Sequence, residues 1–366
     1  MRILIVTHAS ISPELGAGQM AINLGEALRK QGHKVQLWSP HPLTAKARWG
    51  IIQQFFSLQQ MRSKLDTFIE TQEPFDIIDS PAVLITKKLS KSALVVSARS
   101  VQPNLLYQAE KLRSGVELSL KGIVRLPINY AYSLTLALLV FQGWSRATYI
   151  LCLGSVELNW MKRWFPWWRE KLLSYVNALS KPDREALAEV RQHRKMQDRK
   201  GIQFLWIGRW ASHKGADKLI KFIIERVGSY TEDTFTIAGC GDYPEKDVPK
   251  ELIQSGRVKL IPSFTRNQLY SILANHDVGL FTSRVEGWGL SLNEMLESGM
   301  TVFATPAGGV LDLQPFFKEV LKPFPPPKSF TNEQLVYSPF PENYYEVFNW
   351  DKIAEKYKYL VTNCEK

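Results

Sequence analysis

The stretch EGWGLSLNE, residues 286–294, puts two carboxylates eight positions apart around two glycines. Glu286 and Glu294 could serve as an acid and a base, as two clamps on a ligand, or as parts of a turn and a helix. The glycines between them allow the backbone to approach a ligand closely. Backbone N–H groups from Leu290 onward would lie at a helix start, where anions bind. The pattern therefore predicts a phosphate site in this stretch.

A second interpretation of the same stretch is purely structural. Ser291 and Glu294 have the S-x-x-E spacing of a capping box, which predicts a short helix over 292–298 that ends at Gly299. This interpretation accounts for Glu294, but it leaves Glu286 unexplained.

Two cations, Arg209 and Lys214, lie in IGRWASHKGADKL, residues 207–219, directly after an apolar run. If that run is a strand of an open parallel sheet, the cations lie at the edge where such sheets hold ligands. Two cations opposite a helix N-terminus would hold a diphosphate and stabilise it as it leaves. Alone they could be solvated surface charges, and it is the combination with 286–294 that favours a ligand site.

Short apolar runs alternate with helical patterns along the whole chain, beginning with a helix expected over Gln19–Gln31. In the first half, strands are expected at Arg2–Thr7, Lys34–Ser39, Asp76–Ser80, Ala93–Ala98 and Tyr149–Leu153. In the second half, they are expected at Ile202–Gly208, Thr234–Gly239, Val258–Pro262, Val278–Thr282 and Thr301–Thr305. Repetition of strand, helix and strand predicts parallel sheets covered on both faces.

The predicted class is α/β, with two Rossmann-like β/α/β domains that face each other across a cleft. The polar, proline-bearing stretch Asn177–Glu189 suggests the boundary. We therefore expect a first domain over 1–177, a second over 178–345, and a C-terminal helix in 346–366. The proline-rich segment Lys322–Phe330 is expected to be an extended surface connection.

Composition indicates a globular protein, because 45% of the 366 residues are hydrophobic and 22% are charged. The cysteines are too few and too scattered for a disulfide framework or a metal site, and they indicate a reducing compartment; they are Cys152, Cys240 and Cys364. The opening MRILIVTHAS has too short an apolar run for a signal peptide. We expect a cytoplasmic protein.

Positive charge is concentrated in the first half. Residues 1–177 hold 21 Lys/Arg against 11 Asp/Glu, whereas residues 178–366 hold 25 against 24. Such a field attracts nucleic acid, an anionic membrane or an acidic substrate, although it can also be a solvated surface. Because no nucleic-acid-binding module is visible, we expect no nucleic-acid partner.

Two apolar segments of the first half raise the question of membrane contact. WMKRWFPWWREK, residues 160–171, mixes tryptophans with basic residues and could lie at a membrane interface, stack on bases, or pack in the domain junction. Residues 126–145 carry no charge and are long enough to span a bilayer. Pro127 and the polar residues that follow it favour a buried or interfacial helix instead.

Residues 204–310 resemble the nucleotide-sugar half of retaining glycosyltransferases of family 4, the glycosyl transferases group 1, which have the GT-B architecture. The segments that carry the resemblance follow the family's order and spacing, including its E-x7-E pair; they are GRWASHKGAD, FTIAGCGD, VKLIPSF and GLFTSRVEGWGLSLNEMLESGMTVFATPAGG. Residues 347–361 resemble the family's terminal helix, which crosses back to the first domain. The resemblance is weaker over 1–203.

The resemblance implies a role for each matching residue of the second domain. Arg209 and Lys214 would bind the donor diphosphate, Glu286 would contact hydroxyls of the donor sugar, and Glu294 would bind the ribose. The catalytic set would be Glu286, Arg209 and Lys214. The backbone would cradle phosphate at Gly289, Leu290 and Ser291. The two glutamates would then be ligand clamps rather than the acid and base of a hydrolase.

In the first domain, which would hold the acceptor, the resemblance places Gly16 and Gly18 on the other wall of the cleft, near the diphosphate and the acceptor. His8, just past the first strand, is a candidate acceptor contact. Where the family commonly has T-x-H, this chain has SAR, so that Arg99 replaces a histidine; an arginine can bind an anion but cannot transfer a proton near neutral pH. The family's N-G-V-D at the junction is here NALS, residues 177–180.

The implied activity is transfer of a hexose from a UDP- or GDP-linked donor to an acceptor hydroxyl, with retention of configuration. The acceptor hydroxyl would attack the face from which the diphosphate departs. The acceptor could be a lipid or polysaccharide precursor, acidic or membrane-associated, with the enzyme at the inner face of the membrane. No metal or cofactor is expected, because cationic side chains and helix ends neutralise the developing charge.

Two alternatives stay open. Replacement of the histidine by Arg99 motivates a GT-B protein that binds a sugar nucleotide without transferring it. Separately, Gly16, Gly18 and Ala21 spell G-x-G-x-x-A, a pattern of NAD-dependent oxidoreductases. In that motif the glycines follow the first strand at once and an acidic residue ends the second strand. Neither condition is met here.

Overall fold

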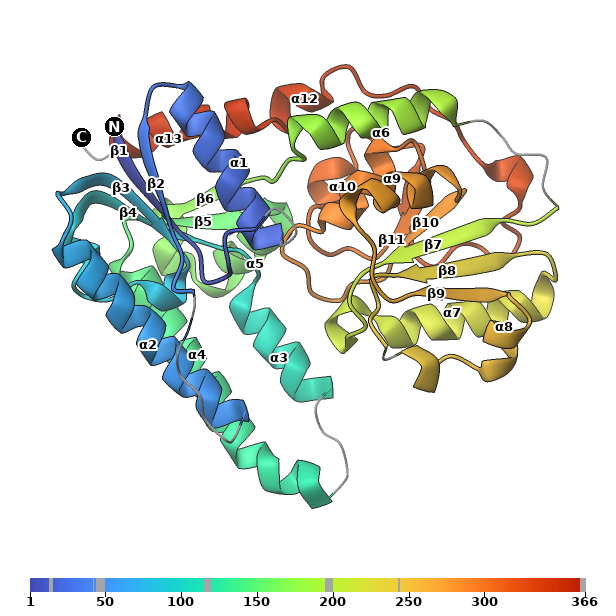
Figure 1. Cartoon of the computed structure of the whole chain (residues 1–366), viewed down its shortest axis with the longest axis horizontal. Coiled ribbons are helices and arrows are strands. Elements are labelled where there is room, and N and C mark those ends of the chain that lie inside the picture. Colours follow the sequence, from blue (N-terminus) through green and yellow to red (C-terminus); the bar gives the residue numbers. More distant parts are fainter. Residues whose placement is uncertain are drawn as a thin grey trace. The chain divides into compact units, whose positions relative to one another are not determined.

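The computed structural model describes residues 1–12, 16–41, 43, 50–114, 120–194, 200–242 and 244–362. The chain divides into two compact units, the first made of Met1–Asn177 with Glu346–Lys366 and the second of Ala178–Tyr345 (Figure 1). Each unit contains its own parallel six-stranded sheet. The predicted α/β class is confirmed.

The sheet of the first unit has the order β2-β1-β3-β4-β5-β6. Its strands are β1 (Arg2–Val6), β2 (Lys34–Trp38), β3 (Phe75–Ser80), β4 (Ala93–Arg99), β5 (Tyr149–Leu153) and β6 (Leu172–Tyr175). Its helices are α1 (Gly16–Lys30), α2 (Gly50–Glu70), α3 (Asn104–Ser114), α4 (Leu120–Arg146), α5 (Gly154–Trp164) and α13 (Trp350–Thr362). In Figure 1, α1 and α13 cover one face of this sheet, and α2 and α4 cover the other.

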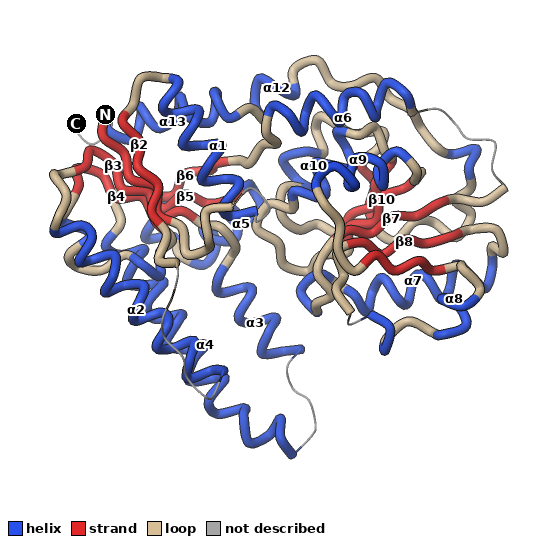
Figure 2. Tube along the Cα trace, viewed as in Figure 1, coloured by secondary structure: helices blue, strands red, loops and turns tan. Residues whose placement is uncertain are grey.

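The sheet of the second unit has the order β12-β11-β10-β7-β8-β9. Its strands are β7 (Gln203–Ile207), β8 (Thr234–Ala238), β9 (Val258–Ile261), β10 (Val278–Phe281), β11 (Thr301–Ala304) and β12 (Leu321–Pro323). Its helices are α6 (Lys181–His193), α7 (Ala216–Ser229), α8 (Lys250–Gln254), α9 (Arg266–Ala274), α10 (Leu290–Glu297) and α11 (Val310–Leu313), and α12 (Tyr344–Val347) follows at the unit boundary. In Figure 2 its red strands lie between blue helices.

The strands form where the sequence has continuous apolar runs, because helices bury both faces of each sheet. Ile3–Val6 of β1 is fully buried, and so is all of β10. In the second core, the rings of Phe204 and Phe235 stack with centroids 4.9 Å apart. All ten predicted strands are present within one or two residues of their expected ends, whereas β6 and β12 were not predicted.

The stretch that suggested the boundary is the start of α6. Ser180 is its N-cap, and the Ser180 hydroxyl accepts a hydrogen bond from the Asp183 N–H at 3.3 Å. At the other end, Arg194 donates to carbonyl oxygens at the ends of α9 and α10, including that of Ser298 at 2.8 Å. These bonds satisfy helix-end groups and fix α6 within the second unit.

A buried ion pair holds α13 on the first unit. Arg99 Nε donates to Asp79 Oδ2 at 2.8 Å, and the Tyr357 hydroxyl of α13 donates to the same oxygen at 2.6 Å. Arg99 Nη2 also donates to the Val6 carbonyl at 2.9 Å. One carboxylate therefore joins the interior of the sheet to the helix near the end of the chain.

Cys152 and Cys240 are buried free thiols, and Cys364 lies outside the described residues. The charge-free segment 126–145 lies in α4. Across the described part of the chain, no helix has both the length and the apolar character needed to cross a membrane.

The buried Arg99–Asp79 pair should contribute more to stability than an exposed ion pair does. Asp79→Asn leaves the Arg99 charge buried without a counter-charge and should lower the free energy of unfolding by about 3–5 kcal/mol. Asp351→Asn is the control, because its pair with Lys30 is exposed, and it should cost about 1 kcal/mol or less. Urea denaturation of both variants measures the difference, and equal losses would contradict this view of Asp79.

Candidate functional site

Strand order brings two loops of the second unit together. Because β10 lies between β7 and β11, the loops after β7 and β10 leave the same edge of the sheet side by side. Thr282 Oγ1 donates to the Lys214 carbonyl at 2.7 Å, and the Arg284 N–H donates to the His213 carbonyl at 2.8 Å. The candidate site is built on these two bonded loops.

Lys214 and Glu286 form an ion pair across the two loops, between Nζ and Oε2. Their side chains are only 16% and 14% exposed, so both charges are largely shielded from water. Ser283 Oγ donates to the same carboxylate oxygen at 3.1 Å. The structure thus brings together a predicted diphosphate ligand and the predicted sugar ligand.

Glycine is required where the loop after β7 meets the end of β10. Gly215 has φ +71°, and a Cβ on it would lie 2.0 Å from the Thr282 carbonyl oxygen. Only a residue without a side chain fits this approach and this backbone conformation without strain. Lys214 precedes this glycine, so its position is fixed by backbone packing.

His213 and Arg209 define the charge around Lys214. Burial, and then the charge of Lys214, lower the pKa of His213 to about 4, and Arg209 adds to this effect. His213 is therefore uncharged at neutral pH. Arg209 is exposed at the start of the same loop. The loop thus presents two cations around a neutral imidazole.

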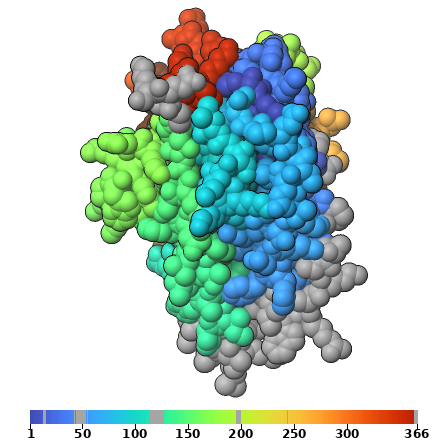
Figure 3. Space-filling model, turned by 90° about the vertical axis from the view of Figure 1, so that its left-hand side faces the viewer, coloured from blue at the N-terminus to red at the C-terminus, as the bar shows by residue number. Residues whose placement is uncertain are grey.

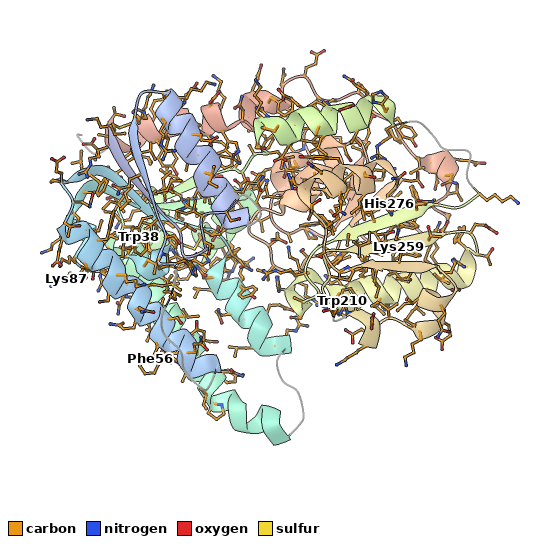
Figure 4. All side chains as sticks on the ribbon, viewed as in Figure 1. Trp38, Phe56, Lys87, Trp210, Lys259 and His276 are labelled. Atoms are coloured by element: carbon orange, nitrogen blue, oxygen red, sulfur yellow. The ribbon has the colours of Figure 1, made fainter. Side chains whose placement is uncertain are left out.

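Trp210 anchors the loop that carries these cations. Its Nε1 donates to Asp247 Oδ2 at 2.6 Å, and its ring packs edge to face on Trp206 with centroids 5.7 Å apart. Figure 4 shows Trp210 at the carboxyl end of the second sheet. The loop is thereby attached to the sheet and to the segment after β8.

The loop after β10 ends in α10, which begins at Leu290, two residues before its predicted start. Gly289 is its N-cap with φ +87°, and a Cβ there would lie 2.7 Å from the ring of Phe281. The N–H groups of Leu290 and Ser291 lie in the first turn, where a helix provides no acceptor for them. The predicted end of the helix at Gly299 is confirmed, with φ +81° at that residue.

The predicted capping box of Ser291 and Glu294 is wrong. The N-cap of α10 makes no side-chain bond, and the Glu294 carboxylate pairs with Arg266 Nη1 instead. Glu294 is 5% exposed, and Arg266 Nε also donates to Asp183 Oδ1 at 2.7 Å. The capping box does not form because Gly289, in the left-handed conformation, is the N-cap, so that the helix begins before Ser291. Glu294 and Glu286 thus have different cationic partners.

A buried polar network that the sequence did not predict supports α10. Trp288 Nε1 donates to Asn293 Oδ1, Asn293 Nδ2 donates to the Tyr344 hydroxyl, and Tyr344 donates to Glu297 Oε1, at 2.7, 2.7 and 2.8 Å. Tyr345 donates to Glu297 Oε2 at 2.8 Å. In the sequence, Asn293 and Glu297 lie four positions apart, which places them on one side of this helix. The network fixes the end of the loop that carries Glu286.

The first unit contains a pocket of about 540 Å³ at the carboxyl end of its sheet. His8, just after β1, and Arg99, at the end of β4, line it together with side chains of α2 and α4 such as Met61, Tyr132 and Leu136. Most of the remaining lining residues are apolar. The two residues predicted on the acceptor side are therefore brought to one pocket.

Arg99 has partners within the first unit, and its role on the acceptor side stays a prediction. The side chain is 1% exposed, and its three nitrogens lie against Asp79 Oδ2, the Val6 carbonyl and Met20 Sδ, at 2.8, 2.9 and 3.5 Å. The guanidinium is committed to the interior because Asp79 would otherwise be a buried unpaired charge. Arg99 contributes structure and positive potential to the pocket wall.

Gly18 has a packing role in the first unit. A Cβ on it would lie 2.5 Å from the Ser12 carbonyl and 2.6 Å from the Ser10 carbonyl, so α1 packs directly on the loop after β1. Gly16 is exposed at the first position of α1. His8 is exposed, and its carbonyl lies 3.1 Å from His41 Nε2.

The histidines give no indication of metal coordination. Within the described ranges, no three or more His, Cys, Asp or Glu side chains form a group that could hold a metal ion. His276, labelled in Figure 4, lies between the Ile272 carbonyl at 2.6 Å and Thr236 Oγ1 at 2.7 Å, which is a packing role.

Both loops and α10 fall within residues 189–315, which match the family model of the "Glycosyl transferases group 1". This span is therefore similar to a glycosyl transferases group 1 domain. It contains the Lys214–Glu286 pair, Arg209 and Glu294.

Two curated relatives have glycosyltransferase names. The chain is 28% identical over 172 residues to the GtfA subunit of the UDP-N-acetylglucosamine–peptide N-acetylglucosaminyltransferase of Streptococcus agalactiae, covering 46% of this chain and 33% of that protein. It is 28% identical over 126 residues to the GPI3 subunit of the phosphatidylinositol N-acetylglucosaminyltransferase of Saccharomyces cerevisiae. That match covers 33% of this chain and 27% of the relative. The chain thus spans a third or less of the length of these relatives.

Solved structures share the fold over the whole chain. Sucrose-phosphate synthase from Thermosynechococcus elongatus matches with a TM-score of 0.66 at 15% identity, over 99% of this chain and 98% of that one. WaaG, a glycosyltransferase involved in lipopolysaccharide biosynthesis, matches with a TM-score of 0.58 at 16% identity, and the match covers 99% of this chain and 97% of that one. HepE from Anabaena, in complex with UDP and glucose, matches with a TM-score of 0.57 at 15% identity, and the match covers 99% of this chain and 100% of that one. The predicted GT-B fold is confirmed.

Glu297 predicts a pH dependence of stability. Burial raises the pKa of Glu297 to about 7, although the hydrogen bonds from Tyr344 and Tyr345 act to lower it. Because the folded state favours the protonated carboxyl, this contribution to stability is fully present below about pH 4.5 and is lost as pH rises through 7. The loss should amount to roughly 3 kcal/mol.

Thermal unfolding of Glu297→Gln between pH 5 and pH 8 measures this contribution. The variant should lose less stability than the parent as pH rises, because its amide does not ionise. Glu225→Gln, at an exposed position of α7, is the control and should leave the profile unchanged. Parallel profiles of the parent and Glu297→Gln would contradict the assignment.

Proposed function

We propose that this protein is a retaining glycosyltransferase that moves a hexose from a nucleotide diphosphate-sugar to an acceptor hydroxyl. The observation that carries the proposal is the shielded Lys214–Glu286 pair at the carboxyl edge of the sheet, beside the first turn of α10. Its position within a span that is similar to a glycosyl transferases group 1 domain supports the same reaction class.

In the proposed donor complex, Lys214 and Arg209 bind the diphosphate. Phosphate oxygens replace the carboxylate as the partner of Lys214 Nζ, since both offer anionic acceptors to one ammonium group. The N–H groups of Leu290 and Ser291, at the positive end of α10, bind the same phosphates. Glu286 is then released to accept hydrogen bonds from sugar hydroxyls.

The proposed chemistry is electrostatic. As the bond between the sugar and the diphosphate breaks, negative charge grows on the leaving oxygens, and Lys214, Arg209 and the helix end stabilise it without a metal ion. The acceptor hydroxyl attacks the face from which the diphosphate leaves and gives its proton to the departing phosphate oxygen, so that the configuration is retained. Glu286 and Glu294 act as clamps rather than as an acid–base pair.

Glu294 is the proposed ligand of the donor ribose. Arg266 holds its carboxylate in place, and Asp183 in turn accepts a hydrogen bond from Arg266. A UDP- or GDP-linked donor is proposed. The complex of HepE with UDP and glucose supports the UDP alternative, and the names of the two curated relatives support an N-acetylglucosamine donor among hexoses.

The proposed acceptor site is the pocket of the first unit. Its mainly apolar wall favours an acceptor with an apolar part, such as a lipid-linked or polysaccharide precursor, with its hydroxyl near His8. We place the protein in the cytoplasm, at the inner face of the membrane. Gly16, at the start of α1, is proposed to lie near the donor diphosphate.

A non-catalytic sugar-nucleotide-binding protein is the second candidate. The observation that favours it is the engagement of Arg99 with Asp79, because no proton-transfer group then occupies the position of the family's histidine. Tight donor binding without turnover on any acceptor, and without donor hydrolysis, would identify this function.

Two variants separate binding from chemistry. Lys214→Ala should weaken UDP binding about 10- to 100-fold, since a hydrogen bond to a charged group contributes about 1.5–3 kcal/mol. Glu286→Gln should bind UDP at least as tightly as the parent, because no carboxylate then competes for Lys214, but it should reduce turnover of the nucleotide sugar about 100-fold or more, because the contacts of Glu286 are made to the sugar. Calorimetric titration and a donor-turnover assay measure the two quantities.

Lys221→Ala, which removes an exposed lysine of α7, is the matched control and should bind UDP as the parent does. Screening UDP- and GDP-sugars by thermal shift first selects the donor, since a ligand stabilises only the folded state. Unchanged nucleotide affinity in Lys214→Ala would contradict the assignment of the diphosphate site.

A further inference from the structure

The outward face of α4 is apolar. Tyr130, Leu134, Leu138 and Phe141 are 50%, 62%, 56% and 41% exposed, at spacings that place them on one side of the helix. No charged residue occurs between 127 and 145. A helix face that meets water is normally polar, and a contiguous apolar face indicates an interaction site.

Aromatic contacts extend this face beyond α4. The ring of Phe141 lies 4.7 Å from that of Trp168, and Trp168 lies 5.9 Å from Trp167. Trp167 and Trp164 are 64% and 59% exposed. Lys171 fixes their segment to the end of α4 by donating to the carbonyl of Ala147. Trp167 therefore continues the apolar face of α4, and Trp164 is exposed at the end of α5, shortly before it in the chain.

The adjoining helix α2 also has an exposed aromatic side chain. Phe55 packs edge to face on Tyr132 of α4 with centroids 4.8 Å apart. Its neighbour Phe56 is 61% exposed, and Figure 4 shows it on the outer side of α2. In Figure 3, which views the first unit from this side, α2 in blue and α4 in green both lie at the surface.

Basic residues flank the tryptophans. Lys162, Arg163 and Arg169 are exposed, with Glu170 as the acidic residue beside them. The guanidinium of Arg163 lies 5.8 Å from the ring centre of Trp164. Residues 1–177 as a whole hold 21 Lys/Arg against 11 Asp/Glu. The surface thus combines an apolar stripe, indole rings and excess positive charge.

We propose that this surface, formed by the outward face of α4 with Trp164 and Trp167, docks on an anionic lipid bilayer. Apolar side chains enter the boundary between headgroups and acyl chains, indole rings lie at headgroup depth, and cations contact lipid phosphates. Charge complementarity selects lipid over an apolar protein partner. This surface would hold the protein at the inner face of the membrane, as the proposed function requires, and docking does not depend on the transfer reaction.

The same helix joins the docking surface to the pocket. Tyr132 and Leu136 of α4 line the pocket of the first unit, whereas Leu134 and Leu138 face outward. A lipid-linked acceptor entering that pocket would pass along a helix already in contact with the bilayer. Docking would thus hold the pocket at the membrane surface.

The test is sedimentation of the full chain with phosphatidylglycerol–phosphatidylcholine vesicles. Leu134→Ser with Leu138→Ser should lower partitioning about tenfold or more, because two exposed leucines no longer enter the bilayer. Arg163→Gln with Arg169→Gln should lower it about fivefold per charge and reduce its dependence on salt. Ile224→Ser, at an exposed position of α7, is the control and should bind like the parent.

All variants should keep the thermal midpoint and the UDP affinity of the parent, which separates failure of docking from failure of the donor site. Absence of vesicle binding by the parent at low salt would overturn the proposal, as would equal binding by the double leucine variant. A parent dimer that the leucine substitutions dissociate, without vesicle binding, would assign the face to self-association and would also overturn it.

Discussion

The parallel pairing of β7 with β10 is the constraint on which the candidate site depends. It places two loops at one edge of the sheet, so that Lys214 meets Glu286 although 72 positions separate them in the sequence. Gly215 permits the contact, because a side chain there would collide with the Thr282 carbonyl. The chemistry proposed for the two charges follows from this backbone geometry.

Two buried carboxylates are each paired with an arginine, Asp79 with Arg99 in the first unit and Glu294 with Arg266 in the second. A buried charge without a partner is strongly destabilising, so each carboxylate is positioned by its cation. The Lys214–Glu286 pair differs, because it lies where a phosphate could replace the carboxylate. Structural pairing and ligand binding thus use the same physical interaction.

The sequence predicted those strands that neighbouring residues specify by themselves. Continuous apolar runs predicted ten of the twelve strands found in the described residues. The strand β6 was missed because it is a four-residue run that contains a serine, and β12 was missed because most of it lies in the proline-rich segment. The Glu297 network could not be predicted, since Tyr344 is distant in sequence. The capping box failed because spacing does not show that Gly289 adopts the left-handed conformation. The roles of Arg209, Lys214, Glu286 and Glu294 remain predictions, although the structure gives the last three defined partners.

On donor binding, Lys214 should exchange the Glu286 carboxylate for a diphosphate. A crystal structure of the protein with UDP would show this exchange. Diphosphate oxygens should lie within hydrogen-bond distance of Lys214 Nζ and of the N–H groups at the start of α10, with the bond between Lys214 and Glu286 broken. A diphosphate bound elsewhere, with that bond intact, would show that Lys214 is not its ligand.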